Sequence, residues 1–98
     1  MAGEILTEVS ATVEPGRTQE LVDGYRKLAD SPLPAGLLYS RLLRGDQNRW
    51  QIQTMWRDRG ALDAMRAGSE PPAAPALFQS VGAEPVLGVL TVVAELAG

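Results

Sequence analysis

The sequence predicts one small α+β domain, and three observations support this prediction. Apolar and polar residues alternate over residues 4–13 and again over residues 49–57, which is the two-residue period of β-strands. Between these stretches, apolar residues recur at helical spacing up to about Ala29. A chain of 98 residues has room for one compact domain. We therefore treat residues 1–98 as a single domain.

The first half of the chain reads as a strand followed by a helix. One face of the strand at residues 4–13 is the more apolar, and it carries Ile5, Thr7, Val9, Ala11 and Val13. Pro15-Gly16 ends this strand, and a proline suits the first turn of a helix because its missing N–H is not needed there. The helix has one apolar stripe, made of Thr18, Leu21, Val22, Tyr25, Leu28 and Ala29. Gly24 weakens this helix by about 1 kcal/mol relative to alanine, so we expect it to mark close packing.

The second half begins with a predicted β-hairpin. Residues 37–44 and 49–57 are the expected strands, and the turn residues Gly45-Asp-Gln-Asn48 join them. Asp58 is the expected N-cap of a short helix. Residues 68–75 are expected to form a loop, and residues 76–81 a single extra helical turn. Residues 86–96 are rich in β-branched and apolar side chains, so we expect a buried final strand.

The resulting order is strand, helix, strand, strand, helix, strand, which is typical of the ferredoxin-like split βαβ fold. This fold has one four-stranded antiparallel sheet with its helices on one face. The sequence also gives the other face considerable apolar surface, which is unusual for a monomer. We therefore expect a symmetric homodimer, paired sheet against sheet, that closes an eight-stranded α/β barrel.

Composition argues against several classes of function. The net charge is −3 with both signs interspersed, so nucleic acid is not an expected partner. The chain contains no histidine and no cysteine, which removes zinc sites built on those ligands, a Ser-His-Asp triad and the common haem ligands. No glycine-rich phosphate loop is present. We expect no metal and no cofactor.

Membrane insertion and export are not expected either. The apolar stretch at residues 86–96 is interrupted by Gly88 and Thr91 and is too short to span a bilayer as a helix. The first residues lack the basic segment of a signal peptide. The expected location is the cytoplasm.

Several short segments carry a resemblance to a known family. They are residues 13–16 (Val-Glu-Pro-Gly), residues 28–32 (Leu-Ala-Asp-Ser-Pro), residues 36–43 (Gly-Leu-Leu-Tyr-Ser-Arg-Leu-Leu), residues 55–58 (Met-Trp-Arg-Asp) and residues 61–62 (Ala-Leu). From about Ile5 to Leu96 the chain resembles the antibiotic biosynthesis monooxygenase (ABM) domain of the dimeric α/β-barrel superfamily. The best single marker is Trp56 at a strand end, followed by the acidic start of a helix.

The resemblance implies a fold and an activity. In the family, the tryptophan that matches Trp56 often lines a cavity between the sheet and its helices. Some members oxidise aromatic polyketides with molecular oxygen and without metal, flavin or haem. Others degrade haem with a histidine near the second helix, and this chain has none. Several monooxygenases carry an asparagine on the third strand, where this chain offers Ile52 and Thr54.

The candidate catalytic residues are Trp56, Tyr39 and Thr54. Trp56 and Tyr39 would hold a flat aromatic ligand, and Thr54 with an arginine would stabilise its anion. Candidate ligand-binding residues are Trp50, Tyr25, Phe78, Arg41 and Arg66, with Phe78 as a lid. The plainer alternative for the aromatic residues is core packing.

The charged candidates also have a plainer alternative. Five arginines gather around the hairpin and its exit: Arg41, Arg44, Arg49, Arg57 and Arg59. One of them could bind a ligand anion, and the plainer alternative is that they are solvated or paired with Asp46 and Asp58. Glu8 is a candidate base, or else it is exposed or lies at the dimer seam with Gln51 and Gln53.

Three functions remain open from the sequence. The first is a cofactor-independent monooxygenase that acts on a small aromatic, polyketide-like molecule. The second is a non-catalytic dimeric module that binds a ligand or assembles with partners. The third is a polyketide cyclase or isomerase on the same scaffold, since one fold hosts many chemistries.

Overall fold

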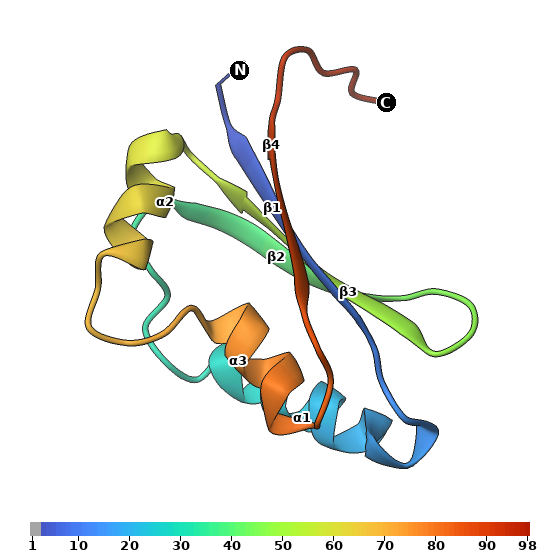
Figure 1. Ribbon diagram of the computed structural model, residues 1–98. Helices are drawn as coiled ribbons and strands as arrows, with labels where there is room; N and C mark the ends of the chain where they lie inside the picture. The colour runs from blue at the N-terminus through green and yellow to red at the C-terminus, as the bar shows by residue number, and fades with distance from the viewer. Residues whose placement is uncertain (1–2) are drawn as a thin grey trace.

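The computed structural model describes residues 3–98, and its helices all lie on one face of a four-stranded antiparallel sheet (Figure 1). The elements in chain order are β1 (Ile5–Thr12), a 3-10 turn η1 (Pro15–Arg17), α1 (Thr18–Leu28), β2 (Leu37–Arg44), β3 (Arg49–Trp56), α2 (Arg59–Arg66), α3 (Ala73–Ser80) and β4 (Val86–Thr91). The strand order is β2-β3-β1-β4. The predicted ferredoxin-like α+β fold is confirmed.

The pairing of β1 with β3 fixes which side chains face the helices. Opposite one another in this ladder stand Ile5 and Trp56, Thr7 and Thr54, Val9 and Ile52, and Ala11 and Trp50. All of these residues are buried except Thr7, which is half-buried. The period-2 pattern that predicted one inward face for each of these strands is therefore confirmed.

The residues beneath the helices form two separate apolar clusters. The α1/α3 cluster consists of Val9, Ala11, Val13, Leu21, Trp50, Ile52, Phe78 and Val81. The α2 cluster consists of Ile5, Trp56, Ala61 and Leu62, with Leu37 and Met65 packed against it. The core is thus divided along the length of the central strands.

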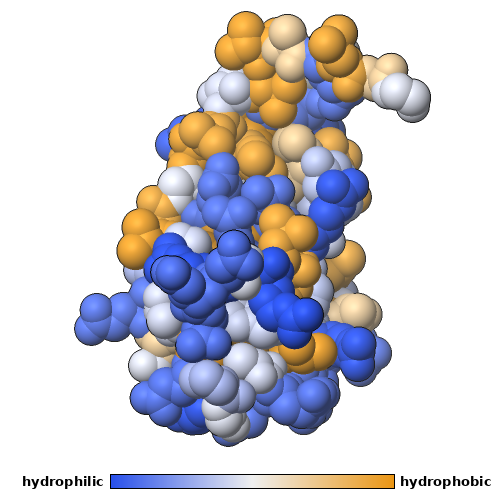
Figure 2. All heavy atoms as spheres, turned by 90° about the vertical axis from the view of Figure 1, so that its right-hand side faces the viewer, coloured by the Kyte–Doolittle hydropathy of each residue, from blue (hydrophilic) through white to orange (hydrophobic). Residues whose placement is uncertain are grey.

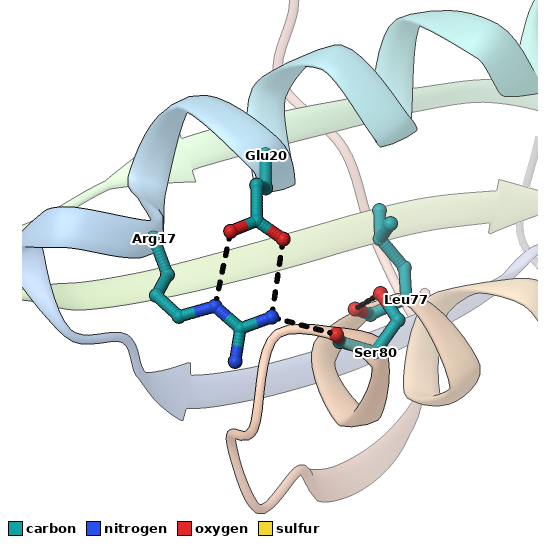
Figure 3. Close-up of polar contacts among 4 residues, drawn as sticks. All are labelled: Arg17, Glu20, Leu77 and Ser80. Atoms are coloured by element: carbon teal, nitrogen blue, oxygen red, sulfur yellow. Dashed lines mark hydrogen bonds and ion pairs between the residues drawn. The ribbon is translucent and has the colours of Figure 1, made fainter.

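Helices α1 and α3 are held together by close packing and by one arginine. A Cβ atom on Gly24 would lie 2.6 Å from Leu77 Cδ1, so the close packing expected at Gly24 is confirmed. Arg17 donates from Nε and Nη2 to the two carboxylate oxygens of Glu20, each at 3.1 Å, and from Nη2 to the carbonyl oxygen of Ser80 at 3.1 Å (Figure 3). The ion pair lowers the pKa of Glu20 and raises that of Arg17. The start of α1 is thereby tied to the end of α3.

Two predicted elements need correction. Helix α3 has eight residues instead of one turn, and it begins at Ala73, inside the segment predicted to be a loop. Pro75 does not prevent this, because it occupies the first turn, where backbone N–H groups have no helical partner.

The final strand ends at Thr91, and its apolar side chains are exposed in the single chain, with Val86 at 64% and Leu90 at 52%. Its position at the sheet edge leaves it without a covering element.

The open face of the sheet carries both apolar and polar side chains. Figure 2 shows apolar atoms gathered toward the end of the molecule where β4 runs into the C-terminal segment, and more polar atoms toward the other end. Within residues 3–98, no helix is long and apolar enough to cross a membrane.

Candidate functional site

Between the two apolar clusters, a line of hydroxyl groups crosses the helix-facing side of the sheet. The strand register places Ser40 of β2 opposite Thr54 of β3, and Thr54 opposite Thr7 of β1. We call these three residues the hydroxyl row. An interior hydroxyl costs free energy unless it is hydrogen-bonded, and an apolar side chain would avoid that cost. Three hydroxyls at this level of the core therefore need hydrogen-bond partners.

The hydroxyl row is joined to two aromatic side chains by hydrogen bonds. Trp56 Nε1 donates to Thr7 Oγ1 at 3.0 Å, and Thr7 Oγ1 donates to the carbonyl oxygen of Thr54 at 3.3 Å. Thr54 Oγ1 donates to Ser40 Oγ at 3.2 Å. Tyr25 reaches down from α1, and its hydroxyl donates to Ser40 Oγ at 2.8 Å. One connected network thus links α1 to three adjacent strands.

The site combines a buried floor with accessible polar groups. Trp56 is 3% exposed and Thr54 is 8% exposed, whereas Thr7, Tyr25 and Ser40 are only half-buried. An indole ring offers a flat apolar surface, and each hydroxyl can donate or accept a hydrogen bond. No carboxylate and no cation takes part in these hydrogen bonds. The arrangement suits a flat ligand that carries an oxygen atom.

Tyr39 does not join this site, contrary to the sequence prediction. A β-bulge lies between Leu37, which is opposite Trp56, and Tyr39, which is opposite Met55. The extra residue reverses which side chains of β2 face the helices. Tyr39 consequently lies on the open face, 39% exposed, with the Arg41 guanidinium carbon 4.6 Å from its ring centroid. The same bulge brings Ser40 to the helix-facing side.

Two hollows in the surface lie away from the hydroxyl row. One of about 290 Å3 and one of about 390 Å3 flank the β2–β3 hairpin, and both are lined by Arg44, Gly45 and Trp50. Neither is lined by Trp56 or by a member of the hydroxyl row. The candidate site is therefore defined by its hydrogen bonds and by its half-buried members.

The chain matches no protein-family model and no curated protein. Its structure is similar to an asparagine-to-alanine mutant of SnoaB, a cofactor-independent oxygenase from Streptomyces nogalater, with a TM-score of 0.77 and 23% identity over 99% of this chain and 100% of that one. It is also similar to a Caulobacter crescentus protein named as a candidate antibiotic biosynthesis monooxygenase, with a TM-score of 0.72 and 19% identity over 95% of this chain and 92% of that one. For a heme-degrading protein from Mycobacterium tuberculosis, the TM-score is 0.69 and the identity is 25% over 98% of this chain and 99% of that one. The chain has the ABM-domain fold.

Within this ABM fold, most of the other sequence candidates serve packing or lie on the surface. Trp50 and Phe78 belong to the α1/α3 cluster, and Phe78 has no exposed surface, which favours core packing over a lid. Arg66 lies exposed in the last turn of α2. Glu8 lies on the open face, where Gln51 Nε2 donates to its carboxylate at 2.9 Å. These residues do not meet Trp56 and Thr54.

The charged residues at the exit of β3 have structural partners. Asp58 Oδ1 accepts from the backbone N–H of Ala61 at 2.8 Å, which confirms Asp58 as the N-cap of α2. This hydrogen bond is the main cause of the lowered pKa of Asp58. Arg57 pairs with Asp58 at 3.3 Å, and Arg59 pairs with Asp63 at 3.2 Å. In the described part of the chain, no group of three or more His, Cys, Asp or Glu side chains could hold a metal ion.

Sequence analysis missed two members of the hydroxyl row. For Thr7 a signal was present, because a hydroxyl interrupts the apolar face between Ile5 and Val9. For Ser40 there was no such signal, because strict alternation places it on the opposite face of β2 from its observed position.

Proposed function

We propose that this chain is a cofactor-independent monooxygenase that acts with molecular oxygen on a small aromatic, polyketide-like molecule at the hydroxyl row. One observation carries the proposal: a hydrogen-bonded row of hydroxyls beside Trp56 interrupts an otherwise apolar layer between sheet and helices. Similarity to SnoaB over the whole of both chains supports the same activity.

The reaction that fits this site is the oxidation of an activated ring CH2 to a carbonyl. The substrate first loses a proton to water, and the resulting anion passes an electron to O2. In the complete reaction one oxygen atom enters the product as C=O, and the other leaves as water with the two hydrogens of the CH2 group. The conversion of CH2 to C=O is a four-electron oxidation. It supplies all four electrons that reduce O2, so no further reductant is required.

The roles of the residues follow from their positions. Trp56 supports the flat ring system, and a hydroxyl of the row donates a hydrogen bond to the oxygen on which negative charge develops. The apolar clusters on either side limit contact between the anion and bulk water. The protein therefore acts by positioning the substrate and by favouring its ionised form.

A ligand-binding module without catalysis is the second candidate. Two departures favour it: Ile52 and Thr54 stand where several monooxygenases carry an asparagine, and the hollows lie at the hairpin instead of at Trp56. For either function we propose a homodimer paired through the open sheet face, whose exposed apolar residues include Tyr39, Leu43 and Leu90.

Oxygen uptake in the presence of 1,8-dihydroxyanthrone tests the activity. We expect one O2 consumed per anthraquinone formed, and a loss of uptake in Trp56→Phe but not in Trp50→Phe. Saturable binding without uptake above the uncatalysed rate would instead establish the binding module. Conversion of a polyketide substrate without oxygen would indicate a cyclase or isomerase.

A further inference from the structure

We infer that the Ser40 hydroxyl is the hydrogen-bond donor that contacts the substrate oxyanion, so that the site selects a phenolate or enolate over the neutral molecule. This inference rests on the proposed function, because it concerns the same site. It narrows the hydroxyl row to a single donor, and it names a residue that no motif indicated.

The hydrogen bonds around Ser40 leave it only one further role. Its Oγ accepts from the Tyr25 hydroxyl at 2.8 Å and from Thr54 Oγ1 at 3.2 Å. A serine hydroxyl has two acceptor lone pairs and one hydrogen, so these two contacts occupy its capacity to accept. Among residues 3–98, no hydrogen bond has Ser40 Oγ as its donor. Ser40 is thus poised to donate.

The two accepted hydrogen bonds also strengthen Ser40 as a donor. Hydrogen bonds arranged in a chain polarise one another, and this effect is larger where the surroundings are poor in water. The network is flanked by the α1/α3 cluster and the α2 cluster. A donor in such a site stabilises an anionic oxygen more than a neutral phenol, which must find an acceptor for its own hydrogen.

The hydrogen bonds to Ser40 come from hydroxyl groups and not from charged side chains. Among residues 3–98, Tyr25 of α1 is the titratable residue that hydrogen-bonds to Ser40, and the neighbour of Ser40 across the ladder is Thr54 of β3. The adjacent Arg41 lies opposite Gln53 on the open face and contacts Tyr39. Preference for an anion would therefore come from hydroxyl donors and not from an arginine.

Titration of bound alizarin tests the inference without turnover. Alizarin is a flat tricyclic phenol that changes colour on ionisation and lacks the CH2 group that the reaction oxidises. We expect its apparent pKa to fall by about one unit when it binds the wild-type protein, which corresponds to about tenfold tighter binding of the ionised form. In Ser40→Ala the shift is lost, and in Ser40→Thr, which keeps the hydroxyl, it is largely retained.

A matched control and a second variant keep the test decisive. Ser10→Ala removes a hydroxyl from the open face, where Ser10 accepts from Arg49, and should leave the shift unchanged. If Ser40→Ala does not fold, Tyr25→Phe removes a donor to Ser40 without altering β2, and we expect a smaller shift. Alizarin bound without a pKa shift, or with a shift that survives Ser40→Ala, would overturn the Ser40 assignment and leave the proposed function standing. Failure of both alizarin and the anthrone to bind would overturn both.

Discussion

Only one of the two tyrosines predicted to take part in the site lies there. Tyr25 was expected to bind the ligand and Tyr39 to take part in catalysis, but only Tyr25 reaches the hydroxyl row. Tyr39 lies across the sheet from it, in contact with Arg41. The candidate site therefore contains a phenol from α1 and none from β2.

The different positions of Tyr25 and Tyr39 give a paired prediction. Tyr25→Phe keeps the ring but removes the donor to Ser40, so we expect the rate of oxygen uptake to fall about tenfold, the effect of losing one useful hydrogen bond. Tyr39→Phe should change the rate less than twofold. Initial rates measured with an oxygen electrode, at equal protein concentration and with the fold checked by circular dichroism, provide the comparison. Equal losses in the two variants would contradict the assignment.

At the level of single residues, the sequence predicts what depends on local chemistry. Asp58 was recognised as a helix cap because its acceptor group and the apolar helix face after it are both local signals. The shared face of Thr54 and Trp56 follows from alternation in β3. Ser40 could not be predicted, because a bulge is a property of strand pairing that a single strand does not reveal.

At the level of elements, two carboxylates anchor helices and make their stability depend on pH. Glu20 holds Arg17 at the start of α1, and Asp58 caps α2. Arg17 lowers the pKa of Glu20, and the Ala61 backbone N–H lowers that of Asp58. Because the unfolded chain binds these protons more readily, the stability they contribute is present above the usual carboxyl pKa values and is lost as pH falls through the lowered ones.

Thermal unfolding between pH 7 and pH 3 checks this dependence. We expect the Tm of the wild type to fall below about pH 4. Glu20→Gln and Asp58→Asn should each make this fall shallower, because their replacements do not titrate. Glu70→Gln, in the exposed segment before α3, is the control. A pH profile that the two variants leave unchanged would show that these carboxylates do not couple protonation to folding.

The elements also differ in how well their sequences specify them. β1 and β3 are central strands that are buried on one face. Their apolar and polar residues therefore alternate, and both strands were placed correctly from the sequence. β4 is apolar on both faces, which predicted a buried strand. It lies at an edge of the sheet instead, and its apolar side chains are not buried by this chain alone. Helix α3 was predicted too short because its prolines suggested a loop, although a helix accepts proline in its first turn.

At the level of the whole molecule, the open sheet face is the main surface without a covering layer. Alongside its exposed apolar side chains it carries the polar chain in which Gln53 donates to Gln51 at 2.8 Å and Gln51 donates to Glu8. Mixed surfaces of this kind are compatible with a specific interface, whose rim and hydrogen bonds fix the register. The proposed homodimer would bury this face.

Light scattering after size-exclusion chromatography tests the homodimer. We expect twice the mass of the chain for the wild type, and the mass of a single chain for Leu43→Glu, which places a charge on the open face. Leu33→Glu, at an exposed leucine in the connection between α1 and β2, should remain dimeric. A monomeric wild type would contradict the expectation, as would a Leu43→Glu variant that is still dimeric.

The central claim is that an aromatic ligand binds beside Trp56, and fluorescence titration with 1,8-dihydroxyanthrone under nitrogen tests it most directly. The chain has two tryptophans, so Trp50→Phe leaves Trp56 as the reporter and Trp56→Phe leaves Trp50. We predict saturable quenching in wild type and in Trp50→Phe, and none in Trp56→Phe. Saturable quenching that persists in Trp56→Phe would place the ligand near the hairpin hollows and contradict the claim.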